Sequence, residues 1–350
     1  MPELNITSSQ KVSNAAIDAN DKSKIIFIND KISWQAKLLN SVLLKRILKP
    51  LISKVTKEEL DVKASRSGVK YFDKLAAKHK STKAKNSDSQ TLNQQNPEQF
   101  STRNLANVPC SYLETTSTNE RILLYFHGGG FCIHLPKTYE HFVGKLAQDL
   151  NANAFMPNYR LAPEHPFPAG IDDCLNVYKQ LLKIGYQAKN IIISGDSAGG
   201  NLTLTTLIQI RDQNLPAPAA AILISPATDV STSGFELMAE NSGKDSVFTI
   251  DALKTLTLNY TTAAIGGDNK LVSPLLNDLH GLPAMQFHVG STELLLNNSV
   301  RANDKANKAG TDSQLVIWNN MPHVHPLFTW LPESKRALNM MVNFADKHLI

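Results

Sequence analysis

Beyond about residue 105 the chain alternates short apolar runs with longer stretches of helical periodicity, and this alternation limits the folds open to it. Strands that alternate with helices favour the α/β class, a mostly parallel sheet flanked by helices. Right-handed crossovers then bring the carboxyl ends of the strands to one edge, where functional sites collect. The expected strands are residues 111–116, 121–126, 152–158, 190–194, 220–225, 285–290 and 313–318, with helices near 138–150, 171–185, 200–213, 247–264, 297–309 and 334–347.

The segment IIISGDSAGGN, residues 191–201, ends a buried-strand pattern on a serine between small residues. A helical run follows at once, so Ser197 stands in a strand–turn–helix context. This is the setting of the G-x-S-x-G turn, in which a strained serine is exposed at the top of a sheet. Gly195 and Gly199 would let the strand and the helix approach closely. Ser197 is therefore the candidate nucleophile, and the alternative is a serine that only shapes a turn.

A second segment, LLYFHGGGF at residues 123–131, runs from an apolar strand into His127 and three consecutive glycines. Three glycines present backbone N–H groups with no side chains in the way, which suits a developing oxyanion. The segment lies about 70 residues before Ser197, as the oxyanion loop of a G-x-S-x-G enzyme would. The alternative is a flexible turn.

Three segments in this order, HGGGF, NYRLAPEHPFPA and GDSAGGN, resemble the hormone-sensitive-lipase-like group of α/β-hydrolase esterases over about residues 105–350. The resemblance implies an α/β-hydrolase fold, a mostly parallel central sheet flanked by helices, with a helical cap over the active site. It also implies a serine hydrolase of carboxylic esters with short to medium acyl chains, without metal or organic cofactor. Helices of residues 1–60 and an insertion at about 230–272 would form the cap, a helix and polar linker would occupy 61–104, and 105–350 would be the catalytic domain.

A serine hydrolase of this fold carries its serine, acid and histidine in that order along the chain. The acid should follow the expected strand at 285–290, which makes Glu293 the candidate. The family more often has aspartate there, and glutamate is the variant that the fold allows. The other carboxylates considered do not follow a strand end in the right place, and they are Asp229, Asp278 and Asp304.

The base should follow the last expected strand, where the segment NNMPHVHPLF offers His323 and His325. In the family the histidine comes a few residues past this strand, just after a Met-Pro-like pair. That pattern matches His323. His325 precedes Pro326 and is expected to shape the loop or the pocket.

The resemblance also implies a role for each of these residues. Ser197 would attack the ester, His323 would take its proton, and Glu293 would hold the imidazole in the productive tautomer. The oxyanion would be stabilised by the backbone N–H groups of Gly129, Gly130 and Ala198. Two other functions stay open: a non-catalytic ligand receptor, although relatives of that kind lose the histidine, and acyl transfer to an alcohol other than water.

The composition of the chain limits the expected location of the protein and the kinds of partner that it is expected to bind. The cysteines, Cys110, Cys132 and Cys174, are scattered without metal or disulfide spacing, which favours a reduced, cytoplasmic location. The start of the chain shows no signal-peptide pattern, and no apolar run has the length of a membrane span. Basic and aromatic residues are not interleaved, so we expect no nucleic-acid partner. Small-molecule carboxylic esters are the expected partners, and a homodimer is left open.

The first part of the chain is basic. Residues 1–100 carry 18 Lys or Arg and 10 Asp or Glu, whereas the rest carries 18 and 21. Within it, the spacing from Trp34 to Val55 predicts an amphipathic helix that Pro50 should kink or end. Its apolar face needs a cover, because about ten exposed apolar side chains would make an unusually large patch. The cover is either the hydrolase core, as in a cap, or a weak contact with an anionic lipid surface.

Overall fold

The computed structural model describes residues 24–50, 100–115, 120–262 and 265–349, and these contain one sheet of nine strands. Along the sheet the order is β1-β9-β8-β7-β6-β4-β5-β3-β2. Pairing is parallel from β1 to β5 and antiparallel at β3 with β5 and β2 with β3. The strands are β1 (Ile25–Ile28), β2 (Ser101–Leu105), β3 (Val108–Leu113), β4 (Ile122–Phe126), β5 (Asn153–Pro157), β6 (Ile191–Asp196), β7 (Ala220–Ile224), β8 (Ala284–Gly290) and β9 (Ser313–Trp318).

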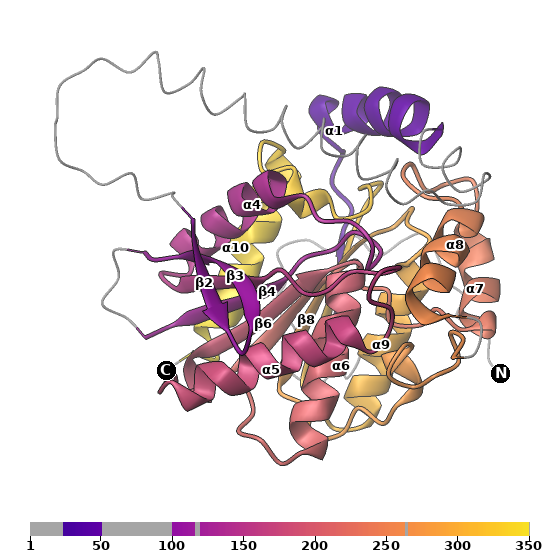
Figure 1. The fold of residues 1–350 in the computed structure, drawn as a ribbon. Coiled ribbons are helices and arrows are strands. Elements are labelled where there is room, and N and C mark those ends of the chain that lie inside the picture. Colours follow the sequence, from indigo (N-terminus) through magenta and orange to yellow (C-terminus); the bar gives the residue numbers. More distant parts are fainter. Residues whose placement is uncertain (1–23, 51–99, 116–119, 263–264, 350) are drawn as a thin grey trace, which may run out of the picture.

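Helices cover both faces of this sheet (Figure 1). Successive strand residues point to opposite faces, so Ile191 and Ile193 of β6 pack in one apolar cluster and Ile192 in the other. The first cluster includes residues of α5 (Ala169–Lys183), α6 (Ala198–Asp212) and α9 (Leu296–Lys308). The second includes residues of α4 (Pro136–Asp149) and α10 (Pro332–Asp346). The expected α/β architecture, a mostly parallel sheet flanked by helices, is confirmed.

The periodicity located seven of the strands but missed two. β1 pairs in parallel with β9, although it lies in the first 60 residues, where only cap helices were expected. A run of four residues, IIFI, is too short to show an alternating pattern, and its residues pair with residues 290 positions later in the chain. β2 was taken as part of the polar linker because four of its five residues are exposed at the edge of the sheet. The sheet therefore begins before the expected boundary at residue 105.

The predicted amphipathic helix begins at Trp34. At its start the Ser33 hydroxyl caps the helix by accepting from the Ala36 N–H. The helix is α-helical over Trp34–Leu38 (α1) and continues as a π-helix over Leu39–Leu48. Its apolar side chains divide between two faces. Ala36, Leu39 and Leu44 are buried in the cluster that contains α10. The exposed ones are Trp34, Leu38, Val42 and Leu43. The predicted continuation to Val55 lies outside the described residues, as do the helix and most of the polar linker expected at 61–104.

Between β7 and β8 the chain leaves the sheet to form the insertion expected at about 230–272. It contains α7 (Thr232–Met238), a short 3-10 turn (Ala239–Asn241) and α8 (Ile250–Thr261), and a further 3-10 turn (Pro274–Leu276) precedes β8. The spacing had predicted α8 as residues 247–264 and had missed α7, whose seven residues span only two turns. In Figure 1, α7 and α8 lie side by side.

Candidate active site

Ser197 lies on the turn between β6 and α6, as predicted. Its φ of 52° and ψ of −117° are a strained combination for a residue with a side chain. The turn is held because the Ser197 N–H donates to the Ile224 carbonyl over 2.8 Å. A Cβ on Gly199 would overlap the Phe126 carbonyl oxygen, and one on Gly195 would overlap that of Gly199. The glycines therefore permit the close packing of strand and helix that the pattern predicted.

The glycine loop follows β4 and is tied to this turn by Asp196. The Asp196 carboxylate accepts from the Gly128 N–H over 2.9 Å and from the hydroxyls of Tyr125 and Tyr139 over 2.8 and 2.9 Å. Burial raises the pKa of Asp196, although these three donors favour its ionised form. Gly129 takes a φ of +112°, which strongly favours glycine. Asp196 thus fixes the glycine loop relative to Ser197.

A second set of contacts holds the same loop from the segment NYRLAPEHPFPAG. The Tyr159 hydroxyl donates to the His127 carbonyl over 2.7 Å, and the two rings stack with centroids 4.3 Å apart. Burial lowers the pKa of His127 well below its usual value, so this imidazole is neutral at pH 7. The buried Asp173 carboxylate accepts from both Nε and Nη2 of Arg160, which anchors the segment to α5.

Glu293 and His323 meet at the carboxyl edge of the sheet. His323 Nδ1 lies 2.8 Å from Oε2 of Glu293, and both residues are buried. The other oxygen of Glu293 accepts from the Ser225 hydroxyl over 2.8 Å and from the Gly290 N–H. Burial raises the pKa of Glu293, and the hydrogen bond and charge of His323 oppose this. Burial lowers the pKa of His323, but the hydrogen bond and charge of Glu293 outweigh it, so that the His323 pKa lies above 6.5.

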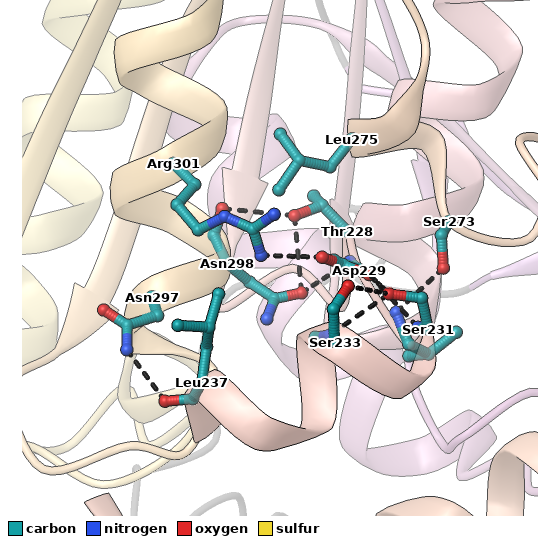
Figure 2. Close-up of polar contacts among 12 residues, drawn as sticks. Thr228, Asp229, Ser231, Ser233, Leu237, Ser273, Leu275, Asn297, Asn298 and Arg301 are labelled. Carbon is teal, nitrogen blue, oxygen red and sulfur yellow. Dashed lines mark hydrogen bonds and ion pairs between the residues drawn. The ribbon is translucent and has the colours of Figure 1, made fainter. Parts of the chain in front are cut away.

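The other carboxylates weighed from the sequence have partners elsewhere. Asp229 is buried in an ion pair with Arg301 of α9, beside Asn298 and Ser231 (Figure 2). The remaining two pair at the surface, Asp278 with His280 and Asp304 with Lys308.

His325 lies in the loop of His323 but points into the core. It is fully buried against Trp318, with ring centroids 5.1 Å apart. Neither of its ring nitrogens has a hydrogen-bond partner among the residues that the structure describes. Burial lowers its pKa well below the usual value, so it stays neutral. This position agrees with the structural role expected for His325.

A small cavity opens at Ser197. Its volume is about 20 Å³. Phe248 connects this cavity to the Glu293–His323 pair, because its ring lines the cavity and packs edge-on against His323, with centroids 5.1 Å apart and an angle of 77°. The cavity is lined by Gly130, Phe131, Ser197, Ala198, Ala227, Val230, Met238, Phe248, Leu253, Leu256, Thr257 and Leu295. Four of the six predicted site residues thus lie at the cavity or contact its wall directly, and Gly129 and Glu293 adjoin them.

Sequence reasoning missed the residues that support the pair. Ser225 is the last residue of an expected strand, at the edge where sites collect, so its position was a usable signal. Asp245, whose carboxylate accepts from the Leu294 N–H, lies in an aperiodic loop of the insertion and gave no signal.

Comparison with known proteins agrees with this geometry. A family model described as the alpha/beta hydrolase fold matches residues 123–327. The chain belongs to the α/β-hydrolase family. This α/β-hydrolase is 34% identical over 242 residues to an esterase of Acinetobacter venetianus, over 69% of this chain and 80% of the relative. It is also 34% identical to an acetyl-hydrolase of Streptomyces hygroscopicus, over 63% and 73% of the two chains.

A solved structure supports the subgroup. The crystal structure of an esterase from the bacterial hormone-sensitive lipase family superposes with a TM-score of 0.73 at 28% identity, over 86% of this chain and 99% of that one. The protein is therefore a hydrolase of the carboxylesterase type in the hormone-sensitive-lipase-like group, as the sequence resemblance predicted.

Two further features concern the described residues only. They contain no group of three or more His, Cys, Asp or Glu side chains arranged to hold a metal ion. None of their helices is both long enough and apolar enough to cross a bilayer.

Proposed function

We propose that this hydrolase cleaves carboxylic esters through an acyl-enzyme on Ser197, with His323 as general base and acid and Glu293 as its orienting acid. The observation that carries the proposal is the buried hydrogen bond of 2.8 Å between His323 and Glu293, whose loops follow the last two strands of the chain. A carboxylate at Nδ1 favours the tautomer with its proton there, which leaves Nε2 free to accept one.

The reaction has two halves. Ser197 Oγ attacks the ester carbonyl carbon while its proton passes to Nε2 of His323, and the carbonyl oxygen becomes an oxyanion. When the intermediate collapses, His323 protonates the departing alkoxide, and the alcohol leaves. Water then attacks the acyl-enzyme and gives a proton to His323; when this intermediate collapses, the bond to Ser197 Oγ breaks, His323 returns the proton to Oγ, and the acid is released.

The backbone N–H groups of Gly129, Gly130 and Ala198 are proposed to stabilise the oxyanion. Gly130 and Ala198 line the cavity at Ser197, which supports this assignment. The contacts of Asp196 and Tyr159 would keep the loop in place before the substrate arrives. Such preorganisation matters because the loss of one donor costs about 10²–10³ in rate.

The acyl group is proposed to enter the cavity between the glycine loop and the insertion. Met238, Phe248 and Leu256 of the insertion form its apolar wall, which supports the assignment of about 230–272 to a cap. The small cavity favours the short end of the range expected from sequence, acetyl to butyryl, because each further CH₂ needs room that these side chains fill.

A fluorophosphonate probe tests the mechanism. It should label the protein at Ser197, located by peptide mapping, and labelling should be lost in Ser197→Ala. Hydrolysis of p-nitrophenyl esters should fall as the acyl chain lengthens beyond butyryl. An unlabelled wild type would favour the receptor alternative, and ester products formed in the presence of an added alcohol would favour acyl transfer.

A further inference from the structure

Two side chains of the insertion bind opposite ends of one peptide group, the one that joins Glu293 to Leu294. Asn241 donates from Nδ2 to the Glu293 carbonyl over 2.7 Å. Asp245 accepts at Oδ2 from the Leu294 N–H over 2.9 Å. Both side chains are buried, and Asp245 is only 2% exposed. The backbone immediately after the proposed acid is therefore held by residues about 50 positions earlier in the chain.

The second oxygen of Asp245 organises the turn that contacts His323. Oδ1 accepts from the N–H groups of Val247 and Phe248 over 2.7 and 2.9 Å. This turn presents the Phe248 ring edge-on to the His323 imidazole. One carboxylate thus fixes the peptide after Glu293 and the ring that packs on His323, which are the two sides of the pair.

The N-terminal helix reaches the same turn. Lys49, at the end of this helix, donates from Nζ to the Asp245 carbonyl over 2.5 Å. The Ser246 hydroxyl donates to Oδ1 of Asn40 over 3.1 Å. The segment from Asn241 to Ser246 is therefore a junction between the helix that begins at Trp34, the insertion and the loop of Glu293.

We infer that Asn241 and Asp245 are positioning residues that hold Glu293 and His323 in register, so that the insertion takes part in the chemical step as well as in substrate fit. The inference rests on the proposed Ser197–His323–Glu293 mechanism. Neither residue lines the cavity at Ser197, so neither is placed to bind the acyl group. A displacement of about 1 Å in such a pair costs on the order of 100-fold in rate, so loss of either contact should lower kcat.

Two variants, each with a matched control, test this role. Asp245→Asn keeps the size but puts an amide N–H₂ where Leu294 needs an acceptor, and Asn241→Leu removes the donor to Glu293. Each should lower kcat about 10- to 100-fold with KM nearly unchanged, and should slow fluorophosphonate labelling of Ser197 by a similar factor. The controls are Asp251→Asn, an exposed carboxylate of α8, and Asn259→Leu, whose amide donates to the Thr255 carbonyl of its own helix. Both controls should keep wild-type kinetics.

The pH profile tests whether Asp245 acts on His323, independently of the loss in kcat. His323 faces the carboxylates of Glu293, Asp245 and Asp196, each of which favours its protonated form. Asp245→Asn removes one of these charges, so the acidic limb of kcat/KM should move to lower pH. Asn241→Leu changes no charge, so its limb should stay in place. An acidic limb that stays in place in Asp245→Asn would show that the Asp245 charge does not act on His323.

The outcomes are distinct. A folded Asp245→Asn protein with kcat within twofold of wild type, or with its loss confined to KM, overturns the inference. If Asp245→Asn does not fold, Asn241→Leu decides in the same way, and wild-type kcat in that variant overturns it. A wild type that the fluorophosphonate does not label at Ser197 defeats the proposed function itself. Normal labelling of wild type and of both variants defeats only the positioning role.

Discussion

The sheet and the insertion meet at Ser197, but they hold their residues there by different means. On the sheet side, two contacts close to the nucleophile fix the site: the N–H of the strained Ser197 turn donates to the Ile224 carbonyl, and the buried Asp196 carboxylate holds the glycine loop. The insertion contributes apolar walls such as Leu256 and long-range side-chain hydrogen bonds such as that of Asp245. Changes on the sheet side should therefore abolish chemistry, whereas changes in the insertion should tune it.

The largest expected effect is that of replacing His323, and it is compared with that of replacing His325 in the same loop. His323→Ala should lower kcat by about 10⁶, as loss of the base does in serine hydrolases of known mechanism. His325→Ala should keep kcat within about tenfold of wild type at pH 7.5, because that ring faces Trp318 and not the cavity. Steady-state kinetics with p-nitrophenyl acetate measure both. The opposite ranking would show that the base is misassigned.

The next effect concerns Glu293, the proposed partner of the proposed base. Glu293→Gln should lower kcat by about 10⁴, because the amide keeps the size but loses the charge that favours the imidazolium. Glu293→Asp should be less severe, since it keeps the charge on a shorter side chain. Asp304→Asn is the control, a surface carboxylate paired with Lys308, and should behave as wild type. Full activity in Glu293→Gln would show that Glu293 is not the acid of the triad, and the other carboxylates would then have to be tested.

The same contrast explains what the sequence could predict. Periodicity located seven strands, because each is a short apolar run between helices, and the order of the segments predicted that Glu293 and His323 would lie on neighbouring loops. β1 could not be predicted, since a four-residue strand is specified by its partner β9 and not by its own pattern. The roles of Asn241 and Asp245 could not be predicted for the same reason. Their role comes from a contact with a residue about 50 positions away, and nothing local marks it.

Two adjacent glycines, Gly129 and Gly130, differ in what an added side chain would meet: backbone at the first and a side chain of the insertion at the second. A Cβ on Gly129 would overlap the backbone oxygen of Ile133, whereas one on Gly130 would lie 2.7 Å from Cδ1 of Leu256, a side chain of α8 that can move. Gly129→Ala should therefore displace the loop and cost about 10²–10³ in kcat, the cost of a lost oxyanion donor. Gly130→Ala should cost about tenfold.

The Gly130 effect can be traced to the insertion with a second substitution. Leu256→Ala introduced into Gly130→Ala should restore part of kcat, because it removes the atoms that the new methyl group meets. The same substitution in Gly129→Ala should restore nothing. Equal losses in the two glycine variants, with no rescue of either, would mean that the insertion does not restrain the glycine loop.

The smallest expected effect is on the pH dependence of the free energy of unfolding. It arises from histidines of the sheet and its loops and not from the insertion. His127, His288 and His325 are buried there, whereas residues 230–272 contain no histidine. Burial lowers the pKa of all three, to about 3 for His288. Below pH 6.5 the unfolded chain therefore binds protons at these positions that the folded protein does not, so the free energy of unfolding falls as the pH falls. Each such histidine should remove about 2 kcal/mol at pH 5 relative to pH 7.5.

His325→Phe measures one of these contributions. The ring keeps its shape against Trp318 but cannot bind a proton, so the variant should lose about 2 kcal/mol less than wild type between pH 7.5 and pH 5, determined by urea unfolding at each pH. The raised pKa values of Asp196 and Glu293 act in the same way on both proteins and cancel in the difference. Leu258→Ala in the insertion, at an exposed side chain of α8, is the control, and its loss with pH should equal that of wild type. Equal pH dependence in His325→Phe and wild type would mean that His325 is protonated in the folded protein, and acid sensitivity would then have to arise elsewhere.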